Sequence, residues 1–393
     1  MKYVVCVPDG AADEPLAELG GRTPLGAADL PTFAALARRG EVGRASTIPA
    51  GLPPGSDVGN MSILGYDPAR YHTGRAPIEA AAMGLRIEPG QVAFRANLVT
   101  VGDDGAMVDF AGGHPSTEAA TTVVAALEAQ LGGRQAADGD EVHFHAGVQY
   151  RHILITPESW GHAICVPPHD LTGKAAIGPT GPAAPRIQGL MDASRPVLAQ
   201  VPESGPANQI WLWGQGTAPA LPSFTSVYGL EAGLVSAVDL VRGLGVLTGI
   251  ANVAVEGATG WYDTNYEGKR DAALESLAAG LDLFVIHVEA SDEAGHAGDV
   301  GAKVEALENW DRRILAPLVE GLDSMGHWRM LMLADHATPL ALRTHTSEPV
   351  PYLLVDSRQP GGGGLYTEAA TAGCEPVPAH ELMGRLIGPT RFC

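Results

Sequence analysis

The stretch LDLFVIHVEASDEAGH, residues 281–296, joins a short, mostly apolar run to a cluster of acidic and histidine residues. A run of this length that ends at polar residues is typical of a strand buried on both faces of a parallel sheet. Two other runs have the same form: Lys2–Pro8 (KYVVCVP) ends at Asp9-Gly10, and Trp328–Ala334 (WRMLMLA) ends at Asp335-His336. These runs predict three strands of one sheet, each followed by residues that can carry chemistry.

Helical patterns lie between the predicted strands. Leu30–Arg39 is one, and Ala302–Leu322 is another, with apolar residues at helical spacing and charges on the opposite face. Strands that alternate with helices predict an α/β fold with a mostly parallel sheet flanked by helices. Ligands of such sheets bind beyond the carboxyl ends of the strands, where the acidic and histidine residues collect here.

The middle of the chain has a different pattern. Val92–Phe110 contains two strand-like runs joined by Asp-Asp-Gly, which is a hairpin signal. The elements that follow are a helix at Thr117–Leu131, strands at Glu141–His145 and Tyr150–Thr156, and a segment rich in proline and glycine at Val166–Arg195. We therefore predict a smaller α+β domain, residues 86–204, inserted into a core domain formed by residues 1–85 and 205–393.

Composition limits the classes of partner. The 393 residues are enough for two packed cores, and 45% of them are hydrophobic, as in globular proteins. The formal net charge of −20 argues against nucleic acid or an anionic membrane as a partner. Because the sequence has neither signal-peptide features nor an apolar run of the ~18 residues that a membrane span needs, we expect a cytoplasmic protein. Composition does not predict an oligomeric state.

Candidate metal ligands follow the predicted strands. Asp292 and His296 are four residues apart, so on a helical turn they would share one face and could hold one ion. Asp335 and His336 are adjacent, so in extended chain they would point in opposite directions and could serve two ions or two sides of one site. His345 follows nine residues later.

Two more residues complete the predicted site: Asp9 ends the first strand, and Ser56 lies in a glycine- and proline-rich turn, PPGSDVGN. Each feature by itself has an ordinary structural explanation, since an Asp-Gly after a strand is usually a turn. Their convergence at the strand ends of one sheet is what favours a metal site. Seven other histidines are assigned to the surface or the core: His72, His143, His145, His162, His287, His327 and His380.

This ligand set predicts a particular chemistry. A serine hydroxyl is a poor nucleophile near neutral pH, and coordination to a metal lowers its pKa without a dedicated base. Two cations also stabilise the attacking and leaving oxygens of a phosphoryl group. Carboxylates mixed with imidazoles suit Mn²⁺ or Zn²⁺. We predict two divalent ions and favour Mn²⁺, with Zn²⁺, Co²⁺ and Mg²⁺ as alternatives.

The order of these residues resembles the alkaline phosphatase superfamily, and within it the archaeal-type 2,3-bisphosphoglycerate-independent phosphoglycerate mutases. The motifs that carry the resemblance are CVPDGAAD at 6–13, GSDVGNMSILGYDP at 55–68, YHTGRAPIEA at 71–80, FRANLVTV at 94–101, QYRHILI at 149–155, PPHDLTGK at 167–174, SAVDLVRGLG at 236–245, GATGWYDTNYEGK at 257–269, VEASDEAGHAGD at 288–299 and ADHATPLALRTHTSEPVP at 334–351. They span essentially the whole chain in the expected order.

The resemblance implies an alkaline-phosphatase-like core and a role for each ligand. One ion would be held by Asp292, His296 and His345, and the other by Asp9, Ser56, Asp335 and His336. Ser56 would take the phosphate of 3-phosphoglycerate as phosphoserine and return it to the 2-hydroxyl of glycerate. The substrate would be a small phosphorylated anion, and neither bisphosphoglycerate nor a nucleotide would be needed.

The resemblance also implies substrate contacts. Asp57 and Asn60 would contact the phosphate or orient the serine. The inserted domain would act as a lid, with Arg151 and Lys174 binding the substrate anion and His169 or Asp170 moving the proton of the glycerate hydroxyl. Lys269 is a further substrate-binding candidate, because the chain has only four lysines. Arg75, Arg95 and Asn97 are weaker candidates.

Other functions remain open at this point. A related transfer to another acceptor, as in a homoserine kinase-like enzyme, and phosphomonoester hydrolysis both fit the same site. The sequence contains no GxxxxGK[ST] motif, which argues against a P-loop kinase. A sulfatase normally carries a modified cysteine or serine in a different motif. An inactive metal-binding scaffold would be expected to lack a ligand, and every candidate position here is filled.

Overall fold

The computed structural model describes residues 1–133, 140–359 and 362–388. The chain folds into two compact units, which we call the core unit (1–72 and 221–393) and the inserted unit (73–220). The inserted unit is wider than the predicted residues 86–204. Helix α5 (Arg75–Ala82) packs on strands β3 (Gln91–Val101) and β7 (Gln209–Gly216), and β7 is itself paired with β3. These packing contacts place both flanking segments with the inserted unit.

The core unit is built on an eight-stranded sheet with the order β13-β2-β12-β11-β1-β10-β8-β9. Its strands are β1 (Lys2–Pro8), β2 (Glu41–Ser46), β8 (Ala232–Val235), β9 (Ala251–Asn252), β10 (Leu283–Val288), β11 (Trp328–Leu333), β12 (Val350–Asp356) and β13 (Val377–Pro378). Only β12 runs against the direction of its neighbours β11 and β2. The sheet is therefore mostly parallel, and the three predicted strands form its centre, with β1 between β10 and β11.

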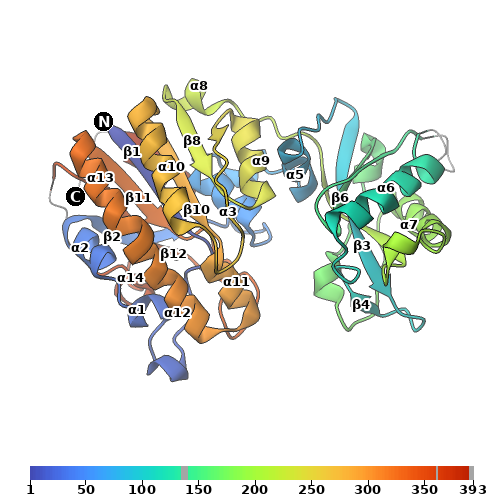
Figure 1. Cartoon of the computed structure of the whole chain (residues 1–393), viewed down its shortest axis with the longest axis horizontal. Helices are drawn as coiled ribbons and strands as arrows, with labels where there is room; N and C mark the ends of the chain where they lie inside the picture. The colour runs from blue at the N-terminus through green and yellow to red at the C-terminus, as the bar shows by residue number, and fades with distance from the viewer. Residues whose placement is uncertain (134–139, 360–361, 389–393) are drawn as a thin grey trace. The chain divides into compact units, whose positions relative to one another are not determined.

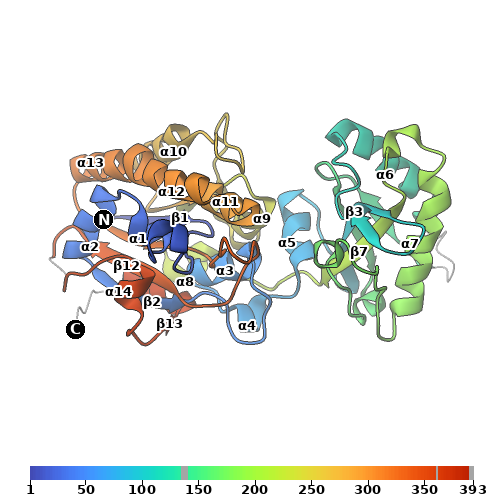
Figure 2. The same ribbon diagram turned by 90° about the horizontal axis from the view of Figure 1, so that it is seen from below.

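Helices flank this sheet (Figures 1 and 2). They are α1 (Pro24–Ala27), α2 (Pro31–Arg39), α3 (Ser56–Ile63), α4 (Pro68–Tyr71), α8 (Phe224–Tyr228), α9 (Asp239–Thr248), α10 (Tyr266–Ala279), α11 (Ala290–Ala297), α12 (Val300–Asn309), α13 (Ala316–Met325), α14 (Glu368–Thr371) and α15 (Leu382–Ile387). The predicted helix Ala302–Leu322 is confirmed and extends from Val300 to Met325, with a π-helical segment at Trp310–Leu315 between α12 and α13. The fold is α/β, as the alternation of strands and helices predicts.

The inserted unit contains a five-stranded antiparallel sheet. Its other elements are β4 (Met107–Asp109), β5 (His143–His145), β6 (Arg151–Pro157), α6 (Thr117–Leu131) and α7 (Ala184–Leu198). Side chains on one face of β3, such as Phe94 and Leu98, pack with residues of α6 and α7, and those on the other face, such as Ala93, pack with residues of α5. The predicted hairpin and α6 are confirmed. Helix α7 was not predicted, because it lies largely in the segment Val166–Arg195, whose prolines and glycines do not indicate a helix.

Within the residues that the structure describes, no helix combines the length and apolar character that crossing a lipid bilayer requires.

Candidate metal centre

The carboxyl ends of β1, β10 and β11 meet at one edge of the core sheet. Strand β1 pairs in parallel with both neighbours, Pro8 lying opposite Val288 and Cys6 opposite Met332. The loops that leave these strands therefore begin side by side. Asp9 follows β1, helix α11 follows β10, and Asp335 and His336 follow β11.

Three buried residues form what we call the strand-end group: Asp9, Asp335 and His336. His336 Nε2 lies 3.6 Å from Asp9 Oδ1 and 3.5 Å from Asp335 Oδ2. Backbone amides of Gly10 and His336 donate to Asp335 Oδ1 at 3.2 and 3.1 Å and fix that carboxylate. All three side chains thus converge from loops that are anchored directly to the central strands.

Asp292, His296 and His345 form a second set, which we call the helix–loop group. Asp292 and His296 come from the first and last turns of α11, with His296 Nε2 3.2 Å from Asp292 Oδ2. His345 comes from the loop before β12, and its Nε2 atom lies 2.9 Å from His296 Nε2. The expected i, i+4 pairing on a helix is therefore present, and three potential ligand atoms face one another.

The two groups are adjacent because the backbone at Gly10, next to Asp9, approaches Asp292 closely. Gly10 has a φ of +60°, and a Cβ atom at this position would lie 2.5 Å from Asp292 Oδ1. Glycine is the residue that accepts both this conformation and this contact. Thr338 links the groups, since its hydroxyl donates to Asp292 Oδ1 and lies 3.2 Å from His336 Nδ1.

Ser56 reaches the strand-end group from the start of α3. Its Oγ atom lies 3.2 Å from His336 Nε2. The sequence predicts a turn here, but Ser56 is the first residue of a helix, whose N-terminal end favours negative charge on a bound group. Helix α3 can lie this close to the end of β11 because Gly59 leaves room for the backbone carbonyl of Asp335.

The two predicted substrate contacts beside Ser56 have partners within the core unit. Asn60 Nδ2 donates to the Ser56 carbonyl at 2.9 Å and to Asp335 Oδ2 at 2.8 Å. Asp57 Oδ2 lies 2.8 Å from His72 Nε2. Asn60 therefore ties the serine to the strand-end group, and His72, which the sequence assigned to the surface or core, contacts the residue next to the serine.

Burial and charge set the protonation of the ligands. Burial lowers the pKa of His336 to about 4, against the charge of Asp335. Burial would also lower the pKa of His296, but its hydrogen bond to Asp292 and the charge of Asp292 outweigh burial and raise that pKa to about 9. Burial, with the charges of Asp335 and Asp292, raises the pKa of Asp9 well above its usual range. Without a cation, Asp9 therefore favours its protonated form. Burial would also raise the pKa of Asp292 and of Asp335, but neighbouring histidines outweigh burial and lower both pKa values below their usual range.

The residues present fit divalent cations. Asp9 Oδ1 is buried and accepts no hydrogen bond from any residue that the structure describes. A buried carboxylate oxygen without a partner is costly unless a cation compensates it. Oxygen and imidazole nitrogen atoms are the ligand types of Mn²⁺ and Zn²⁺. The strand-end and helix–loop groups each offer such atoms from three side chains, and Ser56 adds a hydroxyl.

The sequence missed one feature of the centre, a buried histidine. His287, near the end of β10, was assigned to the surface or core, yet its Nε2 atom lies 3.4 Å from Asp9 Oδ2. Lys269, predicted to bind substrate, has no exposed surface, and its ammonium is 2.6 Å from Glu289 Oε2. In this conformation Lys269 contacts neighbouring protein groups, so we reassign it to the support of the site.

The predicted lid residues lie in the inserted unit. Arg151 begins β6 opposite Asn97 of β3. The His169 ring packs edge-on against Trp213, with ring centres 5.3 Å apart. Lys174 donates to the Asp170 carbonyl at 3.0 Å, so these two residues share one turn.

Two further arginines of the inserted unit belong with Arg151. Arg95 lies over the Trp213 ring and pairs with Glu79 at 2.9 Å. Burial lowers the pKa of Arg95 to about 10 against the charge of Glu79, and the nearby charges of Arg75 and Arg151 act in the same direction as burial. We call Arg75, Arg95 and Arg151 the arginine cluster.

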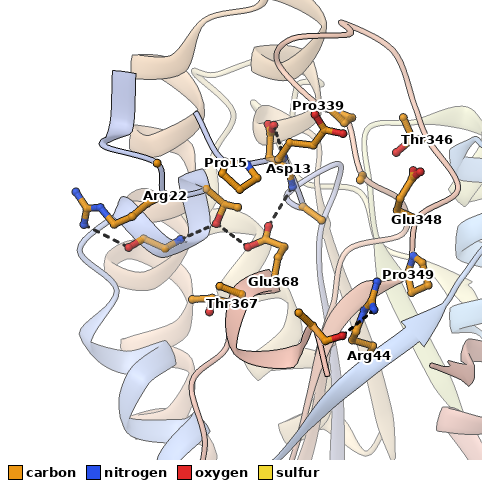
Figure 3. Close-up of a pocket in the computed structure, with 18 of the residues that line it drawn as sticks. Asp13, Pro15, Arg22, Arg44, Pro339, Thr346, Glu348, Pro349, Thr367 and Glu368 are labelled. Atoms are coloured by element: carbon orange, nitrogen blue, oxygen red, sulfur yellow. Dashed lines mark hydrogen bonds between the residues drawn. The ribbon is translucent and has the colours of Figure 1, made fainter. Parts of the chain in front are cut away.

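A separate cavity of about 540 Å³ lies in the core unit beside the loop that carries His336 and His345 (Figure 3). Its lining includes Asp13 and Glu368, and the Glu368 carboxylate accepts from the Asp13 amide and the Thr23 hydroxyl. None of the predicted metal ligands is among the described residues that line it. The buried Lys303 next to it donates to Asp13 and to the Thr338 carbonyl, which fixes the ligand-bearing loop.

Comparison with known proteins gives consistent matches. The family model described as 2,3-bisphosphoglycerate-independent phosphoglycerate mutase matches residues 37–203. A probable enzyme of that name from Geobacter sulfurreducens is 46% identical over 98% of this chain and 100% of its own length. One from Methanothrix thermoacetophila is also 46% identical, over 91% of each chain.

Solved structures agree with these relatives. A Pyrococcus horikoshii protein superposes with a TM-score of 0.78 at 27% identity, covering 98% of this chain and 96% of that one. The cofactor-independent phosphoglycerate mutase of Thermoplasma acidophilum superposes with a TM-score of 0.62 at 26% identity, covering 98% and 99%. The full-length identity and the shared fold lead to one conclusion: this chain belongs to the 2,3-bisphosphoglycerate-independent phosphoglycerate mutase family.

Proposed function

We propose that this chain interconverts 3-phosphoglycerate and 2-phosphoglycerate through a phosphoserine on Ser56, without bisphosphoglycerate or a nucleotide. The observation that carries the proposal is the position of the Ser56 hydroxyl, at a helix N-terminus and 3.2 Å from His336 within a cluster of potential metal ligands. The names of relatives that are 46% identical over nearly the whole chain support the same activity.

Two divalent cations, with Mn²⁺ favoured, would supply charge that activates the serine oxygen and stabilises the phosphoryl oxygens. The helix–loop group (Asp292, His296, His345) would hold one of them. The strand-end group together with Ser56 would hold the other. Asn60 orients Ser56 through its hydrogen bond to the Ser56 carbonyl. Asp57, fixed by His72, stands next to the serine as a candidate phosphate contact.

The reaction on these residues has two balanced halves. In the first, Ser56 Oγ, whose proton would already be lost through the charge of a cation, bonds to phosphorus as the bond between phosphorus and O3 of the substrate breaks, and O3 takes up a proton. In the second, O2 of glycerate gives up its proton and bonds to phosphorus, and Ser56 Oγ is released. His169 or Asp170 is proposed to carry the proton between O3 and O2.

The inserted unit is proposed to act as the lid that binds the substrate and excludes water. The arginine cluster supports this role. Arg75, Arg95 and Arg151 carry three positive charges, and Glu79 offsets one of them. In a chain of formal charge −20, a cluster that keeps a net positive charge is suited to a carboxylate or phosphate. Lys174 is the fourth candidate for the substrate anion. We further propose an alkaline-phosphatase-like arrangement for the core unit and a glycolytic, cytoplasmic setting.

An enolase-coupled assay tests the proposed function. Protein stripped of metal by a chelator is reloaded with Mn²⁺, Co²⁺, Mg²⁺ or Zn²⁺ and mixed with 3-phosphoglycerate alone. We expect turnover with at least one ion, most strongly with Mn²⁺, and no dependence on added bisphosphoglycerate or ATP. Release of inorganic phosphate in place of 2-phosphoglycerate, or turnover that requires ATP, would contradict the proposal.

A further inference from the structure

Strand β10 places a fully buried imidazole against the ligands of the metal centre. His287 Nε2 lies 3.4 Å from Asp9 Oδ2 and 3.9 Å from Asp335 Oδ2. These are the two carboxylates of the strand-end group. The opposite ring nitrogen, Nδ1, faces Glu289 at 3.2 Å. The imidazole therefore lies between the carboxylates that would hold a cation and a third carboxylate behind them.

Several contacts hold the Glu289 carboxylate in place. Its Oε1 atom accepts from the Ala237 amide at 2.7 Å and the Ser236 hydroxyl at 3.0 Å, and it faces His287 Nδ1. Its Oε2 atom lies 2.6 Å from the ammonium of Lys269, which also donates to the His287 carbonyl at 3.0 Å. Lys269 thus holds both the carboxylate of Glu289 and the backbone of His287. Because the Glu289 carboxylate faces Nδ1, its position fixes the orientation of the ring.

Asp9, His287 and Asp335 offer ligand atoms within 4.8 Å of one another, so distance alone would allow His287 to bind an ion. The position of Asn60 argues instead that His287 acts beside the ligands. Asn60 Nδ2 donates to Asp335 Oδ2 and to the Ser56 carbonyl, and these two acceptors fix which end of the amide carries hydrogen. The same nitrogen lies 3.5 Å from His287 Nε2. An amide hydrogen donor next to Nε2 would repel a cation placed between His287 and Asp335.

Burying these charges is expensive. Lys269 and His287 have no exposed surface, and Glu289 has 2%. A buried ion pair commonly contributes less stability than apolar residues of the same volume, so its value lies in fixing a specific geometry. Groups behind metal ligands orient them, and losing one typically weakens metal binding about 10–100-fold.

We infer that His287, held by Glu289 and Lys269, is a positioning residue that fixes Asp9 and Asp335 for the cation of the strand-end group. This inference rests on the proposed function only in assuming that the strand-end group holds a cation. It assigns His287 no contact with the substrate. The two ring nitrogens have different roles, because Nε2 faces Asp9 and Asp335, whereas Nδ1 faces Glu289, which holds the ring.

Two substitutions separate these nitrogens. In His287→Asn the side-chain amide can replace Nδ1 but leaves nothing at Nε2, whereas in His287→Gln the amide nitrogen can replace Nε2. Mn²⁺ is titrated into metal-free, full-length protein, and free Mn²⁺ is measured by electron paramagnetic resonance. We expect two sites in the unsubstituted protein. In His287→Asn one site should weaken about 10–100-fold while the other is unchanged, and His287→Gln should weaken it less.

Arg329→Met provides the matched control. Arg329 forms another buried ion pair, 2.8 Å from Asp356, at the opposite end of β11 from His336. This substitution should lower the melting temperature and leave both Mn²⁺ affinities unchanged. If His287→Asn fails to fold, Glu289→Gln is measured in its place and should weaken the same single site.

Several outcomes would overturn the inference: unchanged Mn²⁺ binding in His287→Asn, an equal weakening of both sites, or complete loss of one ion from both His287→Asn and His287→Gln, which would make His287 a ligand. The titration does not use turnover, so it is independent of the reaction. Two tight Mn²⁺ sites in a protein that does not isomerise phosphoglycerate would contradict the proposed function alone.

Discussion

The two ligand groups of the metal centre differ in what holds them. The strand-end group comes from loops tied directly to β1 and β11, and Asp335 and His336 have no exposed surface. The helix–loop group comes from a short helix and a long loop, and the side chains of His296 and His345 are 36% and 17% exposed. One group is therefore anchored to the sheet and buried, and the histidines of the other are reached by solvent. This contrast predicts that the two ions bind, exchange and respond to protons differently.

The largest effect is expected from Asp335→Asn. The substitution removes a buried charge from the strand-end group while keeping the shape of the side chain. We expect this group to lose its ion and mutase turnover to fall by about a thousandfold, because the charge that activates Ser56 is lost. The Mn²⁺ titration and the coupled assay measure the two effects.

Asp311→Asn is the control for that substitution. Asp311 is also buried, and it accepts hydrogen bonds from the backbone amides of Thr32 and Phe33, away from the centre. It should affect stability and leave metal binding unchanged. Full activity of Asp335→Asn, or loss of both ions from it, would break the distinction between the groups.

A smaller effect is expected from His345→Ala. His345 is partly exposed, so water can enter the vacated position and partly replace the imidazole. We expect the helix–loop ion to bind about 10–100-fold more weakly and turnover to recover when Mn²⁺ is raised. His327→Ala, a change at an exposed histidine elsewhere in the core unit, should have no such effect. Activity that excess Mn²⁺ cannot restore would mean that His345 does more than hold an ion.

The smallest effect is a pH dependence of the helix–loop group. The pKa of His296 is raised to about 9, so below this pH the imidazole holds a proton that an ion must displace. In the Asp335→Asn protein, where only the helix–loop ion remains, Mn²⁺ affinity should fall by about tenfold as pH decreases from 8 to 7. Calorimetry in buffers of different ionisation enthalpy should detect the released proton. An affinity independent of pH would argue against the protonated His296.

The same contrast explains what the sequence could predict. Asp9, Asp335 and His336 follow apolar runs, and that pattern alone places them at the end of a parallel sheet. His287 lies inside such a run, where a buried polar residue is indistinguishable from a core residue until its neighbours in space are known. Two features of the sequence could have indicated a buried charged group here: Glu289, two residues after His287, and the scarcity of lysine. The scarcity of lysine led us to predict only a substrate-binding role for Lys269.

Other differences from the sequence predictions come from long-range packing. Ser56 begins a helix although SDVGN looks like a turn, because Gly59 lets α3 lie against the end of β11. The inserted unit extends to residues 73 and 220 because α5 and β7 pack on β3. Neither contact leaves a local pattern in the sequence, whereas α6 and β1 have such patterns and match their predicted bounds.

Direct detection of the phosphorylated serine tests the central claim. Mn²⁺-loaded protein is mixed with 3-phosphoglycerate, quenched within milliseconds, digested and analysed by mass spectrometry. We expect phosphate on Ser56, none in Ser56→Ala, and undiminished labelling in Ser62→Ala, where the replaced residue is a buried serine of the same helix that donates to the Thr47 carbonyl. Turnover in Ser56→Ala, or phosphate found only on another residue, would contradict it.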